Sequence, residues 1–205
     1  MKNKIIKDAL ALTLITLVAG VALGGVYEIT KDPIAKQEAQ AKAEAYEQVF
    51  TDAAAFEAVE KDDTLTKTIR DQLDQEGYKA QSIEEVMRAE DQSGETLGYA
   101  FTVVTSEGYG GDIQFSMGVQ NDGTLNGISI LSIGETAGLG MNADTPAFKD
   151  QFVGKQVEKL QYTKNGATQD DEINAISGAT VTTNAMTNGV NAGLCAFRVM
   201  EGGDQ

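Results

Sequence analysis

The chain has 205 residues, a formal net charge of −15, one cysteine and no histidine. Without imidazole it cannot contain a Ser-His-Asp or Cys-His catalytic group, or a zinc or haem site with histidine ligands. Cys195 is the single thiol, which excludes an internal disulfide, a CxxC pair and a thiolate-bound iron–sulfur cluster. The acidic balance argues against nucleic acid as a partner, because phosphate binding depends on Lys and Arg. A redox or group-transfer function must therefore use an organic cofactor or work through hydroxyls, carboxylates and backbone amides, and no metal site is predicted.

An apolar segment near the N-terminus predicts a membrane anchor. Residues 9–26 carry no charge and follow a short stretch that contains three lysines. As a helix rising about 1.5 Å per residue, this segment reaches about 27 Å, close to the hydrocarbon thickness of a bilayer. The lysines favour a cytoplasmic N-terminus, so everything after Tyr27 is expected outside the cytoplasm. A cleaved signal peptide, with Gly20 and Ala22 near the cleavage site, is the alternative, and it also exports the rest of the chain.

The region after the anchor is predicted to be helical. Asp32 and Pro33 are residue types that cap and begin a helix. The sequence that follows is rich in Ala, Glu, Gln and Lys and has no glycine or further proline before Gly77. We expect a stalk or a helix packed on the domain, and then a second helix for which Gly77 is the C-cap.

From Ser82 the pattern changes to that of strands. Four segments are rich in β-branched and aromatic residues and are separated by turn residues: 83–91, 96–111, 112–120 and 125–133. The turn at 121–123, Asn-Asp-Gly, indicates a hairpin between the third and the fourth segment. The region is therefore predicted to form an antiparallel sheet.

Three elements are expected after the sheet. A short helix carries Phe148 and Phe152 on one face, and residues 157–166 read as a further strand. Residues 181–200 read as a helix whose only charge is Arg198, so this helix is expected to be buried on most sides. The predicted fold class is α+β: a single N-terminal transmembrane helix followed by an antiparallel-sheet domain with flanking helices.

Two segments carry residue types suited to binding a ligand. The first follows the strand that ends at Ile133 and has glycine at 134, 138 and 140. A backbone with so many glycines can approach a flat ligand closely, and Glu135 and Thr136 offer an acceptor and a hydroxyl at its edge. The segment is not a P-loop, because the required lysine and spacing are missing. An ordinary glycine-rich turn is the alternative.

The second segment is Ser-Gly-Ala-Thr at 177–180, where a loop enters the last helix. The free N–H groups at a helix N-terminus favour a phosphate. Gly178 and Ala179 leave room for it. Hydroxyl groups that could hydrogen-bond a phosphate, or be esterified by it, belong to Ser177, Thr180, Thr182 and Thr183. An ordinary helix cap is the alternative for this segment.

The two segments in this order, Glu-Thr-x-Gly-Leu-Gly and then Ser-Gly-Ala-Thr, behind a single anchor, resemble the FMN-binding domain family. The resemblance is closest to the G subunits of Rnf (Rsx) electron-transport complexes and more distant to the C subunit of the sodium-translocating NADH:quinone reductase. It covers essentially the whole chain, including the Gly-Tyr-Gly-Gly turn at 108–111. Two departures are Asn174, where the family commonly has an acidic residue, and Ala137, where it commonly has proline.

The resemblance implies a site for FMN that is attached covalently, through its phosphate, to the hydroxyl of Thr180. It also implies that the remaining contacts to the cofactor come from both segments, and that no residue is catalytic in its own right. These contacts are Ser177, Gly178, Ala179, Thr183, Asn184, Glu135, Thr136, Gly138, Leu139 and Gly140. Those at 177–184 would lie at the phosphate end, and the 135–140 loop would lie against the ring system.

The resemblance further implies an electron-carrier subunit of a membrane-bound, ion-translocating ferredoxin:NAD oxidoreductase, acting within a translocase and not as a stand-alone catalyst. Its partners would be the other subunits of the Rnf-type complex and, for maturation, a flavin transferase of the ApbE type. It would be a single-pass protein of the cell membrane with an extracytoplasmic FMN domain. We expect residues 1–27 to form the cytoplasmic tip and anchor, 28–80 the helical stalk and N-terminal helices, and 81–205 the FMN-binding domain.

Two alternatives remain at this point. One is an FMN-domain subunit of another exported electron chain, such as the sodium-translocating NADH:quinone reductase. The other is an anchored sensor or scaffold that binds no flavin and uses the Ser-Gly-Ala-Thr turn only as a cap.

Overall fold

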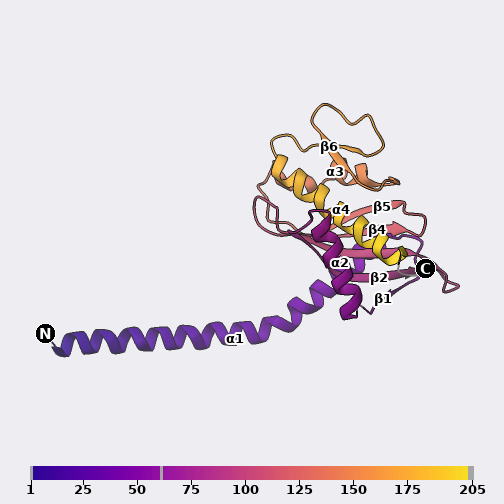
Figure 1. Cartoon of the computed structure of the whole chain (residues 1–205). Coiled ribbons are helices and arrows are strands. Elements are labelled where there is room, and N and C mark those ends of the chain that lie inside the picture. The colour runs from indigo at the N-terminus through magenta and orange to yellow at the C-terminus, as the bar shows by residue number, and fades with distance from the viewer. Residues whose placement is uncertain (1, 61, 203–205) are drawn as a thin grey trace. The chain divides into compact units, whose positions relative to one another are not determined.

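A computed structural model describes residues 2–60 and 62–202, which divide into two compact units (Figure 1). The first unit ends at Ala41 and the second begins at Lys42. Helix α1 (Lys2–Val49) begins in the first unit and ends in the second.

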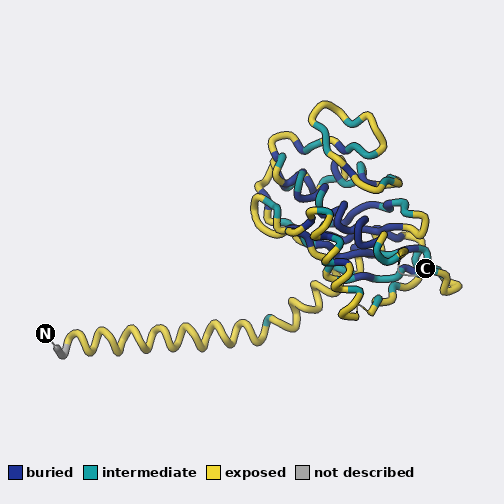
Figure 2. The backbone as a smooth tube through the Cα atoms, viewed as in Figure 1, coloured by how far each residue is buried: buried dark blue, intermediate teal, exposed yellow. Residues whose placement is uncertain are grey.

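The first unit contains the apolar part of α1. Its large side chains are exposed, among them Leu10, Leu17 and Leu23 (Figure 2). Within the described residues, α1 is the one helix that is long and apolar enough to cross a membrane, with a mean hydropathy of 2.3 over its most apolar window. The expected apolar helix is therefore present, and its exposed apolar surface requires cover by lipid or protein.

The expected helix start at Asp32 and Pro33 is wrong, because α1 continues through Pro33 without interruption. Proline has no N–H to donate to the carbonyl four residues earlier, which weakens a helix locally. In a helix that is already formed on both sides, however, extension is far easier than a new start. Thr30, one turn before, also donates its hydroxyl to the Val26 carbonyl oxygen at 2.9 Å, which ties the helix together on the N-terminal side of the proline.

The second unit is built on a five-stranded antiparallel sheet in the order β1-β2-β3-β4-β5. The strands are β1 (Ala55–Ala58), β2 (Gln81–Glu90), β3 (Thr96–Thr105), β4 (Ile113–Gln120) and β5 (Leu125–Ser132). The four strands predicted from Ser82 onward correspond to β2–β5, and the predicted hairpin joins β4 to β5, with Gly123 at a φ of +85°. Strand β1 was not predicted: its sequence, Ala-Phe-Glu-Ala, has no strand pattern, and its pairing with β2 makes it an edge strand.

Helix α2 (Asp63–Gln75) agrees with the second predicted helix. Asp62 caps it by accepting a hydrogen bond from the Leu65 N–H at 2.6 Å. Gly77 follows the helix with a φ of +91°, a conformation that favours glycine.

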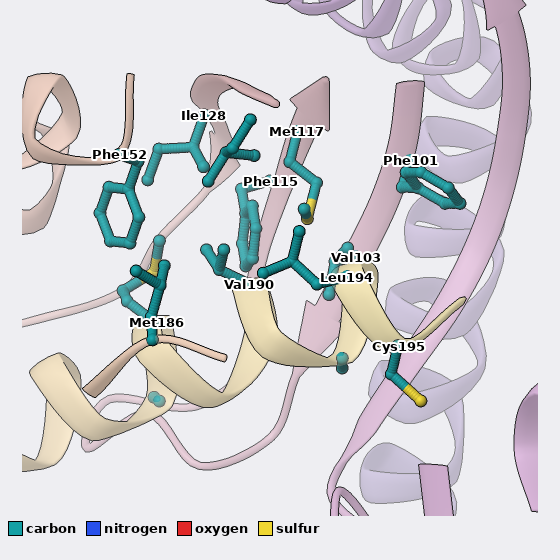
Figure 3. Close-up of a cluster of buried hydrophobic side chains, with 14 of the residues drawn as sticks. Phe101, Val103, Phe115, Met117, Ile128, Phe152, Met186, Val190, Leu194 and Cys195 are labelled. Carbon is teal, nitrogen blue, oxygen red and sulfur yellow. The ribbon is translucent and has the colours of Figure 1, made fainter. Parts of the chain in front are cut away.

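Helix α4 (Thr180–Gly202) packs on one face of the sheet, beside α2 (Figure 1). Most of it is buried, as its low charge predicted. Large side chains on β4, such as Phe115 and Met117, face its residues Val190 and Leu194 (Figure 3). Close approach depends on glycine, because a Cβ at Gly189 would lie 2.8 Å from the Phe115 ring. The position of α4 is thereby fixed against the sheet.

The end of α1 packs on the opposite face, where the sheet offers small side chains such as Ala89 and Ala100. The Tyr46 hydroxyl lies 2.7 Å from the hydroxyl of Thr102 and donates to the Glu85 carboxylate at 3.0 Å. Burial, together with the nearby charge of Glu85, raises the pKa of Tyr46. Tyr46 is therefore a neutral, buried part of this interface.

The segment between β5 and α4 contains short elements. They are η1 (Gly140–Asp144), α3 (Pro146–Lys149), η2 (Asp150–Phe152), β6 (Gln161–Thr163) and β7 (Glu172–Asn174). The predicted Phe148–Phe152 pair is confirmed, with ring centroids 5.4 Å apart. The strand predicted at 157–166 is shorter, and it pairs in parallel with β7, which the sequence did not predict.

Candidate functional site

The two glycine-containing segments meet at one cavity of about 520 Å³. This volume is in the range typical of pockets for small ligands and cofactors. Of the residues expected to contact a cofactor, the walls include Glu135, Thr136, Leu139, Gly140, Gly178, Ala179 and Thr180. The fold thus brings together segments that lie far apart in the sequence.

Thr180 is the first residue of α4 and is half-buried in the cavity wall. In the described part of the chain, no acceptor pairs with the backbone N–H groups of Thr180, Val181 or Thr182. Ala179, which precedes the helix, has no side-chain oxygen with which to cap it. Three backbone donors of a 23-residue helix therefore remain available beside the Thr180 hydroxyl.

Four of the expected contact residues are not among the cavity walls: Ser177, Gly138, Thr183 and Asn184. Thr183 is fully buried, and its hydroxyl accepts from the Ile176 N–H at 3.0 Å and donates to the Ala179 carbonyl at 2.9 Å. This side chain therefore holds the Ser-Gly-Ala-Thr turn against the first turn of α4, which positions Thr180. Ser177 is exposed on the same turn.

The glycines allow the two segments to contact each other. A Cβ at Gly178, where φ is +75°, would lie 3.0 Å from Cδ2 of Leu139. A Cβ at Gly140 would lie 2.5 Å from Oε2 of Glu135 and 2.6 Å from the hydroxyl oxygen of Thr182. Any larger side chain at either position would separate the segments and fill the cavity edge.

Glu135 is the organising side chain of the first segment. It is only 8% exposed, and its Oε1 accepts hydrogen bonds from the backbone N–H groups of Tyr109 at 2.7 Å and Gly110 at 3.4 Å. A buried carboxylate is strongly stabilised by backbone donors of this kind. Glu135 therefore connects the glycine loop to the turn at 108–111.

Three residues of the cavity wall were not predicted from the sequence: Tyr109, Val181 and Thr182. The sequence indicates that Thr182 has a hydroxyl near a phosphate site, but it does not indicate a contact to the cofactor. Tyr109 lies in the Gly-Tyr-Gly-Gly turn, where the glycines are the recognisable feature. These three residues belong to no recognisable sequence motif. They are identified only because the folded chain brings the segments together at the cavity.

The cavity contains no basic side chain among its lining residues, and Glu135 is the single carboxylate among them. The described residues also contain no cluster of His, Cys, Asp and Glu that could hold a metal ion. An anionic ligand would therefore depend on backbone N–H groups and hydroxyls, whereas a flat apolar group would fit the walls formed by Leu139, Val181 and Tyr109.

The chain matches two known families. Residues 108–194 match the FMN-binding domain family, and residues 1–49 match the RnfG N-terminal region. The first match includes both segments that form the cavity.

Similar proteins align over nearly the full chain. The G subunit of the Na⁺-translocating ferredoxin:NAD⁺ oxidoreductase complex of Acetobacterium woodii is 33% identical, over 95% of this chain and 92% of the relative. The G subunit of the proton-translocating ferredoxin:NAD⁺ oxidoreductase complex of Clostridium ljungdahlii is 28% identical, over 98% of this chain and 96% of the relative.

The residues that line the cavity lie within the matched FMN-binding domain, so the chain carries such a domain behind an apolar N-terminal helix. More specifically, the chain belongs to the family of RnfG-type G subunits of ion-translocating oxidoreductase complexes. Among solved structures, the C subunit of the Na⁺-translocating NADH-quinone reductase from Parabacteroides distasonis is similar, with a TM-score of 0.49 and 21% identity over 72% of this chain and 77% of that one.

Proposed function

We propose that this chain is the electron-carrying subunit of a membrane-bound, ion-translocating ferredoxin:NAD oxidoreductase and that it holds FMN through a phosphoester to Thr180. The family and the activities named for its full-length relatives support the first part. The observation that carries the second part is the position of Thr180, at the free N-terminus of α4 and in the wall of the cavity.

The residues present fit FMN. The N–H groups at the start of α4 favour the phosphate, and a phosphodiester at Thr180 would retain one negative charge next to them. Gly140 and Gly178 keep the cavity edge open, since a Cβ at either position would fill it. Leu139 and Val181 offer apolar surface to a flat ring system.

The absence of Lys and Arg from the cavity walls supports a covalent tether. Free FMN would have backbone N–H groups and neutral hydroxyls for its doubly charged phosphate but no cationic side chain, so a covalent bond would prevent its loss outside the cytoplasm. Bound FMN supplies one- and two-electron redox chemistry. The protein's own part is to orient the cofactor, to limit water around it and to fix its position within the complex.

A subunit of a sodium-translocating NADH:quinone reductase is the second candidate. The C subunit of that enzyme from Pasteurella multocida is 41% identical to this chain, but only over 35% of the chain and 31% of the relative. The G subunits align over nearly the full length, which favours the ferredoxin:NAD oxidoreductase.

The attachment is tested by expressing the full-length chain together with an ApbE-type flavin transferase and separating the denatured membranes on a gel. We expect flavin fluorescence at the position of the chain and its complete loss in Thr180→Ala. Thr64→Ala is the matched control, because Thr64 is an exposed threonine in the first turn of α2. Fluorescence that persists in Thr180→Ala, or its absence from the wild type, would contradict the covalent attachment to Thr180.

The extracytoplasmic location of the domain is tested by thiol labelling of intact cells with a membrane-impermeant maleimide. Cys195 is buried, and burial next to the charge of Glu76 raises its pKa to about 12, so the wild type should remain unlabelled. Asp112→Cys, at an exposed position, should react in intact cells. Lys4→Cys should react only after permeabilisation, and the reverse pattern would contradict the proposed orientation.

A further inference from the structure

The 106–111 segment is attached to the rest of the domain at both ends. The half-buried carboxylate of Glu107 holds one end, and the buried carboxylate of Glu135 holds the other. At one end, Oε2 of Glu107 accepts hydrogen bonds from the side-chain amides of Asn184 at 3.2 Å and Asn188 at 2.7 Å. These two asparagines lie one turn apart on α4, the helix that begins with Thr180. The segment is therefore fixed to the same helix that carries the proposed attachment residue.

At the other end, Glu135 accepts from the backbone N–H groups of Tyr109 and Gly110. The glycines of the turn allow this contact. A Cβ at Gly110 would overlap the carbonyl oxygen of Gly134, and a Cβ at Gly108 would lie 3.1 Å from Oε1 of Glu135. The turn and the glycine loop are thus packed backbone to backbone, with the carboxylate between them.

Between the two attachments, the Tyr109 side chain is 77% exposed and lines the cavity. Outside α1, four large apolar side chains are exposed in the described part of the chain: Tyr109, Leu139, Val153 and Val181. Three of the four line this one cavity. Apolar side chains gathered around a cavity indicate a surface that a ligand covers.

We propose that Glu107 and Glu135 are positioning residues that hold Tyr109 at the cavity, so that its ring covers the flat ring system of the bound flavin. The inference rests on the proposed function for the identity of that ring system. Glu135 then acts through the Tyr109 backbone, and its carboxylate is already occupied by protein donors. An aromatic ring next to a flat ring system is favoured by stacking, and a hydrogen-bonded turn keeps it in place at low entropic cost.

The attachment of the segment is tested without flavin, by amide hydrogen exchange of the full-length protein in detergent. In Glu135→Gln the charge-assisted bond becomes a neutral one, so the Tyr109 amide should exchange about tenfold faster than in the wild type. Asp112→Asn is the matched control, because it removes an exposed carboxylate next to the same segment. Equal exchange in the wild type and Glu135→Gln would overturn the role of Glu135.

The covering of the flavin is tested by comparing the flavin emission of the folded chain with that of the same sample after denaturation. A tyrosine in contact with a flavin quenches its emission by donating an electron to the excited state, and phenylalanine does not. We expect a low folded-to-denatured ratio in the wild type, a several-fold higher ratio in Tyr109→Phe, and intermediate ratios in Glu107→Gln and Glu135→Gln. Tyr162→Phe, in β6, is the matched control and should match the wild type.

An unchanged ratio in Tyr109→Phe would overturn the covering role while leaving the attachment to Thr180 intact. A wild-type chain without flavin would overturn the proposed function and the covering role together. The exchange experiment would then still decide the role of Glu135.

Discussion

Helices α2 and α4 begin in different ways, and the difference supports the proposed role of the α4 N-terminus. At α2, the Asp62 carboxylate accepts from the Leu65 N–H, so the helix satisfies one of its first three amides with its own cap. At α4, the preceding residue is Ala179, and the amides of residues 180–182 have no partner in the described part of the chain. A capped helix end is structural, whereas an uncapped end beside a cavity is available to an anionic ligand.

The difference between the two helix ends can be removed by giving α4 an N-cap residue like that of α2. In Ala179→Asp, the new carboxylate would take the free amides and repel a phosphate, so we expect covalent flavin to fall to background. The melting temperature should not fall, because an N-cap carboxylate stabilises a helix by about 1 kcal/mol. Ala179→Asn separates the two causes, since it occupies the amides without charge and should leave a partial flavin load. Full flavin attachment in Ala179→Asp would show that these amides do not receive the phosphate.

The converse change removes the cap of α2. Asp62→Ala should lower the free energy of unfolding by about 1 kcal/mol, because one backbone donor of the first turn loses its partner. Flavin attachment should stay at the wild-type level. Denaturant titration and gel fluorescence check both outcomes, and a loss of flavin in this variant would contradict the separation between a structural and a binding helix end.

The smallest expected effect concerns the contact between the two helices. Burial acts to raise the pKa of Glu76, but hydrogen bonds from Gln72, Arg198 and Cys195 outweigh it and hold the pKa below its usual 4.5. A carboxylate with a depressed pKa contributes stability that is fully present above pH 4.5 and is lost as the pH falls through the lower, folded-state value.

Glu76→Gln should therefore lose less stability than the wild type when the pH falls below 4.5. Because the Arg198–Glu76 pair is partly exposed, we expect a difference of less than about 1 kcal/mol. Denaturant titrations at neutral and acidic pH measure it. Parallel losses in both proteins would show that the contact contributes nothing to acid stability.

Sequence patterns were sufficient to predict those elements that depend on residues close together in the chain. The β-branched and aromatic residues of β2–β5, the Asn-Asp-Gly turn and the low charge of α4 predict elements that the structure contains. The two segments that line the cavity also stand out in the sequence, because their glycines and hydroxyls lie close together in the chain.

The rest depends on contacts between distant residues. Strand β1 exists only through its pairing with β2, and its Ala and Glu residues favour a helix when considered alone. The bond from the Tyr109 N–H to Glu135 joins residues 26 positions apart, and a backbone donor leaves no trace in the sequence. Thr183 matches a hydroxyl-rich motif, yet its hydroxyl is used to hold the turn. These roles follow from tertiary packing and could not be predicted from the motif.

The central claim, that Thr180 at the uncapped end of α4 carries FMN, is tested most directly by the intact mass of the protein purified from its native membrane. We expect the mass to increase by a single FMN phosphoester, and we expect peptide mapping to locate it on the fragment that contains Thr180. An unmodified mass, or flavin on any other residue, would contradict it.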